Sequence, residues 1–190
     1  ARSKIARLNA DGTLDTSFDP GSAVNGVVNN LLVQTDGKAV LVGGFSGGVT
    51  RLNANGTLDL VFNPGTGANG TVQTVLLQPD GKLVMGGAFS SVNGVSRQDV
   101  ARLNTDGLLD LTLDPGTGTQ GGRVNALALQ GDGAVVVGGL FRVFHGRASG
   151  NIAKVGSGSP PTLAPVISQQ PANQSAVVGG TVTFSVTATG

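Results

Sequence analysis

The acidic side chains of this 190-residue chain are eleven aspartates, because glutamate is absent. Several stand in tight turns where oxygen atoms alternate along the chain, as they do in calcium-binding loops. The candidate calcium ligands are Asp11 and Asp15 in the first such stretch and Asp106 and Asp110 in the third. The middle stretch has Asn55 where the first has Asp11, which removes one carboxylate. Asp-Gly and Asn-Gly also favour hairpin turns, so we expect turns here and no required metal or other cofactor.

An arginine and an aspartate recur at a constant separation within the three stretches. The pairs are Arg7 with Asp15, Arg51 with Asp59, and Arg102 with Asp110. On adjacent strands of one hairpin, the two charges would either face a ligand or form a cross-strand ion pair. Opposite charges across a strand pair help to fix its register. We expect the structural ion pair.

The single histidine, His145, makes a poor general base or metal ligand. The chain contains no Cys or Glu, and the loop around His145 has no Asp. His145 aligns with Asn93, and each is followed by Gly. Both residue types are enriched at positive φ, so we predict a turn at each position. No residue of the chain is expected to be catalytic.

Two glycine-rich stretches formally match the dinucleotide-binding pattern Gly-x-Gly-x-x-Gly. They cover residues 65–70 and 116–121. That pattern binds phosphate only when a helix follows it, because the helix N-terminus faces the pyrophosphate. No helix is expected here, so these stretches are predicted to be turns between strands.

The composition predicts an all-β protein. With 12 Lys and Arg and no Glu, the chain lacks the residues that usually cover helix surfaces. Val, Thr, Gly, Asn and Asp, which suit strands and tight turns, take their place. The apolar runs are far shorter than the ~20 residues of a membrane-spanning helix. A net charge of +1 with scattered basic residues argues against nucleic acid as a partner. The absence of Cys excludes disulfides, zinc clusters and a thiol nucleophile.

Three phrases recur in a fixed order along the first 156 residues. Arg-Leu-Asn begins at Arg7, Arg51 and Arg102. Asp/Asn-Pro-Gly follows each of them, and Gln-x-Asp-Gly then leads into an apolar run that ends in Gly-Gly and Phe at Phe45, Phe89 and Phe141. Spacings of roughly 40–50 residues with β composition are typical of propeller blades.

Each repeat divides into about four short strands. In the middle copy we expect them at residues 72–78, 82–89, 99–104 and 108–113, with Asp-Gly turns between pairs. Four antiparallel strands make one propeller blade. The sequence thus predicts about three blades in an open or incomplete ring, because a closed propeller typically needs four to eight.

These phrases resemble the delta-60 repeat of large bacterial surface and secreted proteins, over residues 1–156. The resemblance implies propeller-like repeats and a secreted or cell-surface location. The family carries no established catalytic residues, so none is transferred to this chain.

The three copies differ in one loop, between the Phe and the next Arg-Leu-Asn. The interval runs from Phe45 to only Arg51 in the first copy, but from Phe89 to Arg102 in the second and from Phe141 to Lys154 in the third. Loops on a rigid scaffold often carry function, so the long loops, residues 90–98 and 142–150, are the expected contact sites. The candidate contact residues are Ser91, Asn93, Arg97, Arg142, His145 and Arg147.

The composition changes after residue 156. Residues 157–164 are predicted to be a linker rich in Pro, Ser and Gly. Residues 165–190 resemble the first strands of bacterial immunoglobulin-like domains, with Val182, Phe184, Val186 and Ala188 alternating with Thr and Ser. Since such a domain needs about 100 residues, we expect the sequence to hold only part of it.

We therefore expect a non-enzymatic repeat segment of a large extracellular bacterial protein that serves as an interaction or adhesion scaffold for a protein or polysaccharide. Further blades and immunoglobulin-like domains are expected beside it in the full-length chain. Two alternatives stay open. One is the propeller portion of an extracellular enzyme, of hydrolase or lactonase type, with its catalytic residues elsewhere. The other is a calcium-stabilised adhesin.

Overall fold

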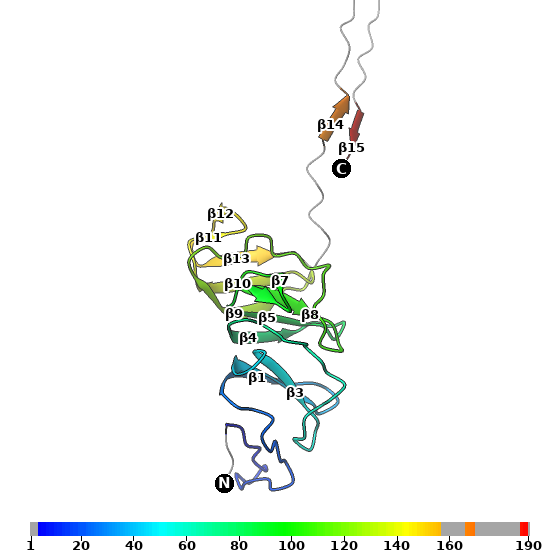
Figure 1. Cartoon of the computed structure of the whole chain (residues 1–190), viewed down its shortest axis with the longest axis vertical. Coiled ribbons are helices and arrows are strands. Elements are labelled where there is room, and N and C mark those ends of the chain that lie inside the picture. The colour runs from blue at the N-terminus through cyan, green and yellow to red at the C-terminus, as the bar shows by residue number, and fades with distance from the viewer. Residues whose placement is uncertain (1–3, 157–165, 170–186, 190) are drawn as a thin grey trace, which may run out of the picture. The chain divides into compact units, whose positions relative to one another are not determined.

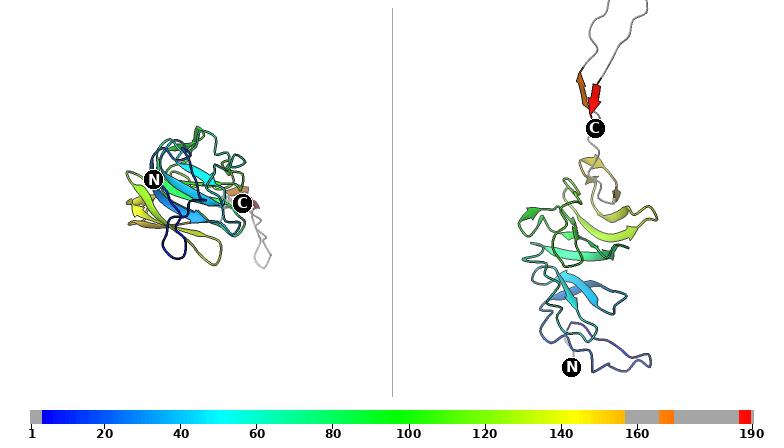
Figure 2. Two further views of the ribbon diagram at one scale, coloured as in Figure 1. Left: turned by 90° about the horizontal axis from the view of Figure 1, so that it is seen from below. Right: turned by 90° about the vertical axis from the view of Figure 1, so that its right-hand side faces the viewer.

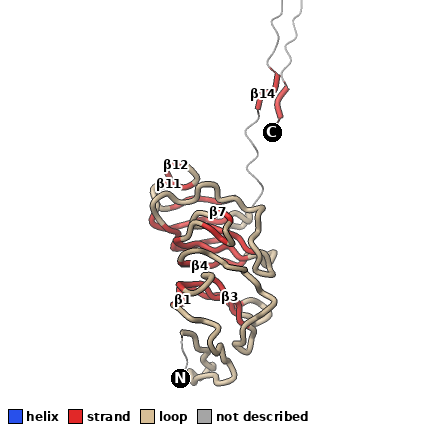
Figure 3. The backbone as a smooth tube through the Cα atoms, in the orientation of Figure 1, coloured by secondary structure: helices blue, strands red, loops and turns tan. Residues whose placement is uncertain are grey.

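Every regular element in the described residues is a β-strand (Figure 3). The computed structural model describes residues 4–156, 166–169 and 187–189. The chain divides into two units, Ala1–Gly158 and Ser159–Gly190. The all-β prediction is confirmed, and none of the described residues lies in a helix able to cross a membrane.

The first unit contains three three-stranded antiparallel sheets that succeed one another as layers (Figure 1). Each sheet is a meander of consecutive strands from one repeat, apart from a small hairpin in the second and third. The strands are β1 (Val27–Val33), β2 (Ala39–Gly44) and β3 (Val49–Leu52); β4 (Thr71–Leu77), β5 (Leu83–Ala88) and β8 (Val100–Leu103); and β9 (Arg123–Leu129), β10 (Val135–Leu140) and β13 (Ile152–Val155). We call these sheets, with the turns that join them, blades one, two and three.

Asp-Gly turns join the first two strands of each blade, as the sequence predicts. In blade two, Asp80 Oδ1 accepts the Lys82 amide at 3.1 Å, and Gly81 has a φ of 82°. Asp36 and Asp132 form the same turn in blades one and three. Short polar side chains that bond their own backbone two residues on are common turn formers, which explains why this phrase recurs.

The fourth strand of blades one and two is shorter than we predicted. Residues 108–113 of blade two contribute a single bridge, between Leu103 and Leu109, and blade one has the equivalent bridge, between Leu52 and Leu58. The Asp110 carboxylate accepts the Thr112 amide at 2.8 Å, so the backbone turns before the strand can lengthen. Blades one and two are therefore propeller-like, with three regular strands and a bridged fourth segment; the corresponding segment of blade three lies outside the described residues.

The long loops of blades two and three are themselves small hairpins. The strands are β6 (Ser91–Val92) and β7 (Val95–Ser96) in blade two, and β11 (Val143–Phe144) and β12 (Arg147–Ala148) in blade three. Asn93 and Gly94 form one turn, with φ of 53° and 75°, and His145 and Gly146 form the other, with φ of 50° and 72°. Two consecutive positive φ values are typical of a type I′ turn, so both predicted turns are confirmed.

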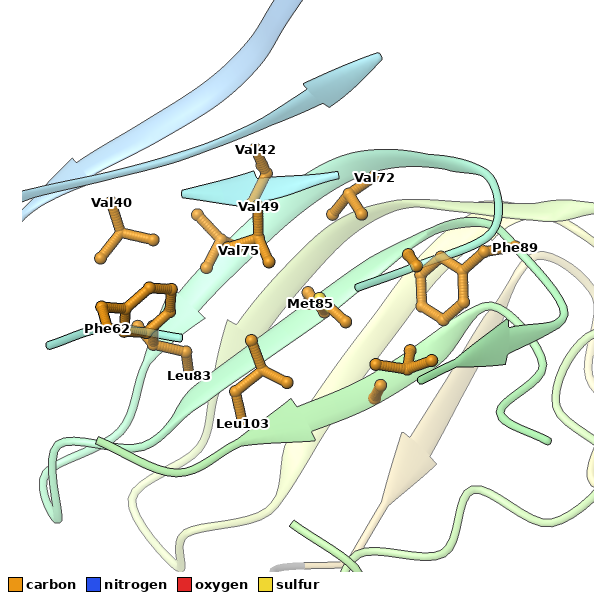
Figure 4. Close-up of a cluster of buried hydrophobic side chains, with 13 residues drawn as sticks. Val40, Val42, Val49, Phe62, Val72, Val75, Leu83, Met85, Phe89 and Leu103 are labelled. Carbon is orange, nitrogen blue, oxygen red and sulfur yellow. The ribbon is translucent and has the colours of Figure 1, made fainter. Parts of the chain in front are cut away.

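The hydrophobic core lies between successive blades. Val40, Val42 and Val49 of blade one face Val72 and Met85 of blade two (Figure 4). A second cluster joins Val84 and Val100 of blade two to residues of β10 and to Phe141 and Phe144. Figure 2 shows the same succession of sheets from the side. The blades form an open ring in which each buries the face of its neighbour, as repeat proteins do.

In the second unit the structure describes only β14 (Val166–Gln169) and β15 (Thr187–Thr189), which pair antiparallel. Both lie where the sequence predicts strands. The predicted linker and Val182, Phe184 and Val186 lie outside the described residues. The immunoglobulin-like assignment stays a prediction.

Candidate functional site

The recurring arginine and aspartate form an ion pair in all three repeats. Nε of the arginine donates to Oδ2 of the aspartate at 2.7 Å for Arg7 and Asp15 and at 2.8 Å for the other two pairs. The side chains of Arg51 and Asp59 are only 9% and 4% exposed, whereas Arg7 is 42% exposed. The expected cross-strand pair is confirmed, and in its two buried copies it does not face solvent.

A lysine completes each buried pair, which the sequence analysis missed. Lys38 Nζ donates to Asp59 at 2.9 Å, and Lys82 Nζ donates to Asp110 at 2.8 Å. Lys38 and Lys82 follow the Asp-Gly turns, so their recurrence there was the available signal. Two cations share one carboxylate in each case, which offsets the cost of burying it.

These contacts change the acidity of the carboxyl groups. Burial raises the pKa of Asp59, but the bonds from Lys38 and Arg51 outweigh burial and bring the pKa to about 2. Burial also raises the pKa of Asp110, yet Lys82, Thr112 and Arg102 hold that pKa well below its usual range. In both groups a hydrogen-bonded cation favours the charged form.

Each candidate calcium ligand is hydrogen-bonded to a backbone amide or to a basic side chain. Asp11 Oδ1 accepts the Thr13 amide at 2.9 Å and its hydroxyl at 2.6 Å, while Asp15 bonds Arg7. Asp106 accepts the Leu108 amide, and Asp110 bonds Arg102 and Lys82. Within the described part of the chain, no three His, Cys, Asp or Glu side chains gather as a metal site. The expectation that these turns require no calcium stays a prediction.

All eleven aspartate carboxylates accept hydrogen bonds that shape the backbone or join strands. Ten of them accept the amide two residues further along. The eleventh, Asp99, is buried and accepts from the Phe89 amide, the Gln98 side chain and the Thr119 hydroxyl. Every acidic group of the sequence thus has a role in holding the blades.

The contact residues predicted for blade two lie on the hairpin β6–β7. Ser91 and Asn93 anchor this hairpin: the Ser91 carbonyl accepts the Asn69 amide at 3.1 Å, and Asn93 Oδ1 accepts the Gly67 amide at 2.9 Å. Arg97 is half-buried, and no described residue bonds its Nε. Its amide donates to the Ser90 carbonyl at 3.0 Å, which closes the base of the hairpin, and its Nη1 donates to the Ser96 carbonyl at 2.9 Å.

The contact residues predicted for blade three lie on the hairpin β11–β12 and are exposed. Arg142 precedes β11, Arg147 begins β12, and His145 stands at the tip. Nδ1 of His145 lies 3.3 Å from the Pro115 carbonyl, and its ring occupies the space where Gly116 lacks a side chain. On this hairpin two arginines are therefore exposed to solvent, and the histidine between them packs against the backbone of Pro115 and Gly116.

The two glycine-rich stretches form the crossings between blades, as predicted. Gly65, Gly67, Gly116, Gly118 and Gly121 all have positive φ. A Cβ on Gly67 would lie 2.1 Å from the Gly47 carbonyl oxygen of blade one. Glycine is needed there because two backbones meet, and no phosphate-binding helix follows.

Comparison with known proteins identifies the class of the fold. Residues 1–18, 34–62 and 78–113 match a family model described as a domain of unknown function (DUF5122) beta-propeller. The chain is also similar to the crystal structure of the WD40 beta propeller domain of Doa1, with a TM-score of 0.50 and 18% sequence identity. That likeness covers 76% of this chain and 40% of the other. No curated protein matches the chain. The chain is a propeller-type repeat protein.

Proposed function

We propose that this chain is a non-enzymatic interaction scaffold. The observation that carries the proposal is the use of all eleven carboxylates within the blades, ten of them in turns formed with the amide two residues on. General acid–base catalysis and carboxylate nucleophiles need such groups directed at a substrate. The chain has no Glu or Cys to replace them, and its single His packs against Pro115.

The contact surface in this proposal consists of the two hairpins β6–β7 and β11–β12. Each is fastened to a crossing segment through its turn: the Asn93 amide donates to the Gly67 carbonyl and the His145 amide donates to the Gly118 carbonyl, both at 2.9 Å. A fixed hairpin loses little entropy on binding. The exposed Arg142 and Arg147 suit a ligand with carboxylate or sulfate groups, such as an acidic polysaccharide or an acidic protein surface.

The resemblance to delta-60 repeats supports a place in a large secreted or cell-surface bacterial protein. The resemblance of residues 165–190 to immunoglobulin-like domains agrees with this location, since such modules commonly space binding domains. Adhesion is the role that fits both features. This part of the proposal rests on the likeness of sequence.

A binding experiment tests the scaffold. The purified chain is passed over immobilised acidic and neutral polysaccharides and over acidic and basic proteins. We expect retention on acidic ligands, and about tenfold weaker binding by the variant Arg142→Ser/Arg147→Ser. Arg123→Ser is the matched control, because Arg123 is an exposed arginine on β9, outside the hairpins. Equal binding by the double variant and the control would contradict the proposed surface.

A further inference from the structure

The loop after the Gly-Gly-Phe phrase closes in the same way in all three blades, whatever its length. Its last residue is Gly48, Asp99 or Asn151, each with positive φ. The amide of that residue donates to the carbonyl of Phe45, Phe89 or Phe141, all at 2.9 Å, and its carbonyl accepts an amide of the preceding strand at 3.0 Å. The hairpins β6–β7 and β11–β12 are therefore insertions into one shared loop, and blade one has the loop without the insertion.

In blades two and three the hairpin adds a strand to the crossing that leads into its own blade. In blade two the Asn69 amide donates to Ser91, and the Gly67 carbonyl accepts from Asn93. In blade three the Gln120 amide donates to Val143, and the Gly118 carbonyl accepts from His145. Isolated bridges, between Ala68 and Val92 and between Thr119 and Phe144, lie between these bonds. One pattern of backbone bonds thus seats both hairpins.

In blade one, no hairpin pairs with the backbone of the segment that leads into the blade, residues 23–25. Asn25 is the counterpart in blade one of Asn69 in blade two. Asn25 Oδ1 accepts a hydrogen bond from the Ser46 amide at 3.4 Å, and Asn69 Oδ1 accepts one from the Ser90 amide in the same way. Among the described residues, none accepts from the Asn25 amide and none donates to the Ala23 carbonyl. A donor and an acceptor two residues apart on one edge are the groups that a further strand binds.

Blade one also lacks the apolar hairpin side chain that covers the Gly-Gly-Phe phenylalanine in blades two and three. In blade three Phe144 of the hairpin packs on Phe141, with ring centroids 5.8 Å apart, and in blade two Val92 shares a buried cluster with Phe89. Phe89 and Phe141 are 4% and 3% exposed, whereas Phe45 is only half-buried.

A cavity marks the place of the missing hairpin. It has a volume of about 320 Å³ and is lined by Ala23 and Asn25 from the crossing, Phe45 and Ser46 from the short loop, and Leu58 and Pro64 from the end of the blade. Leu58 is 43% exposed. The crossing edge, the half-buried phenylalanine and the cavity therefore coincide in blade one.

We propose that blade one is a binding site for a β-hairpin of another protein. The hairpin pairs with the Ala23–Asn25 edge and places a valine or phenylalanine against Phe45, directly before a turn of the Asn-Gly or His-Gly kind. The proposal specifies the partner of the proposed interaction scaffold and rests on it. Strand addition of this type gets its affinity from backbone bonds and its specificity from the side-chain pocket.

The two filled sites on the same chain define the chemistry of the occupant. Val92-Asn93-Gly94 and Phe144-His145-Gly146 are the segments that fill them. A second copy of this chain is a poor donor, because both of its hairpins are already bonded to their own crossings. A partner that presents a free hairpin of the same character is the occupant that fits.

A peptide titration of the full chain tests the site. The probe is a synthetic hairpin with the sequence of residues 90–98, closed by a disulfide between added terminal cysteines; the chain has no Cys with which to exchange. We expect saturable 1:1 binding in isothermal calorimetry, with amide shifts at Ala23, Asn25 and Phe45 in NMR spectra. A probe with Ser in the place of Val92 should bind about tenfold more weakly, because it loses the apolar anchor.

A loop graft provides the matched protein control. Replacing residues 46–48 with the sequence of residues 90–99 gives blade one a hairpin of its own, and we expect it to abolish binding of the probe. Should this graft fail to fold, Ser46→Trp fills the cavity from an exposed position and should weaken binding in the same way.

Three outcomes overturn the site. The first is the absence of binding, and the second is equal binding by the native chain and by the folded variants. The third is self-association of the native chain in sedimentation equilibrium that the graft abolishes, since it would make a second copy the occupant. The graft leaves Arg142 and Arg147 unchanged, so failure here is separate from failure of the ligand-binding test on the hairpins.

Discussion

Arg51 donates from Nη1 to the main-chain carbonyl of Thr105, 54 residues further along, at 3.0 Å. Thr105 lies in the Asp-Gly turn of the next repeat. Arg7 makes the same contact with Ala54, at 2.5 Å. Arg7 and Arg51 of the Arg-Leu-Asn phrase therefore each pair with an aspartate in their own repeat and also bond the turn of the following one. The recurrence of the phrase has a physical reason, because one side chain fixes both register and blade-to-blade contact.

Replacing this arginine should weaken the fold. We expect Arg51→Ala to lower the free energy of unfolding by about 2 kcal/mol, because it removes a buried ion pair and the bond to Thr105, while Lys38 still neutralises Asp59. Chemical denaturation with urea measures the loss.

The exposed copy of the pair is the control for that measurement. Arg7→Ala should cause a clearly smaller loss, because the Arg7 side chain is 42% exposed and surface ion pairs contribute little. Equal losses for the two variants would show that burial of the ion pair does not matter, since both variants lose a bond to the next turn.

Stability should fall in acid. The pKa of Asp59 is about 2 in the folded chain against an ordinary value of 3.8, so its contribution is fully present above about pH 4 and is lost as the pH falls toward 2. The expected decrease from this group is roughly 1–2 kcal/mol. Urea midpoints at several pH values measure it, and Asp59→Asn should flatten the profile. An unchanged slope in that variant would assign the acid sensitivity to other groups.

Local patterns in the sequence were sufficient to predict the turns and the ion pairs. Asn93 and His145 each precede Gly, and Arg51 and Asp59 recur at a fixed separation, so their roles follow from neighbouring residues. The contact of Arg51 with Thr105 depends on how blades stack, which sequence spacing does not encode.

Two other features also escaped the sequence analysis for physical reasons. The shortness of the fourth strand results from the Asp110 carboxylate, which bonds the Thr112 amide in competition with strand pairing. The cavity in blade one follows from a loop shortened between Phe45 and Arg51. The sequence shows that this loop is shorter. It does not show that the missing hairpin would have paired with the backbone of residues 23–25.

Calcium should not be required for stability. Asp11 and Asp106 are engaged by backbone amides and Asp15 and Asp110 by arginines, so turn formation needs no ion. We expect the same melting temperature in EDTA and in millimolar calcium, measured by circular dichroism. A fall of many degrees on chelation would support the calcium-stabilised adhesin.

The turn at His145 should tolerate asparagine. Asn93 fills the same position in blade two with a φ of 53°, so His145→Asn should change the free energy of unfolding by less than about 0.5 kcal/mol. His145→Val should destabilise by about 1–2 kcal/mol, because a β-branched residue is strained at positive φ. Thermal melts of both variants test this, and a large loss in the asparagine variant would assign His145 a role other than the turn.

As a scaffold, this chain should bind a ligand without changing it. The most direct measurement incubates the purified chain with the polysaccharide or protein that retains it, and compares the ligand before and after by mass spectrometry. The scaffold proposal predicts an unchanged ligand mass at every time point. Time-dependent cleavage products that increase with the concentration of the chain, and that persist after repurification, would contradict it and identify an enzyme.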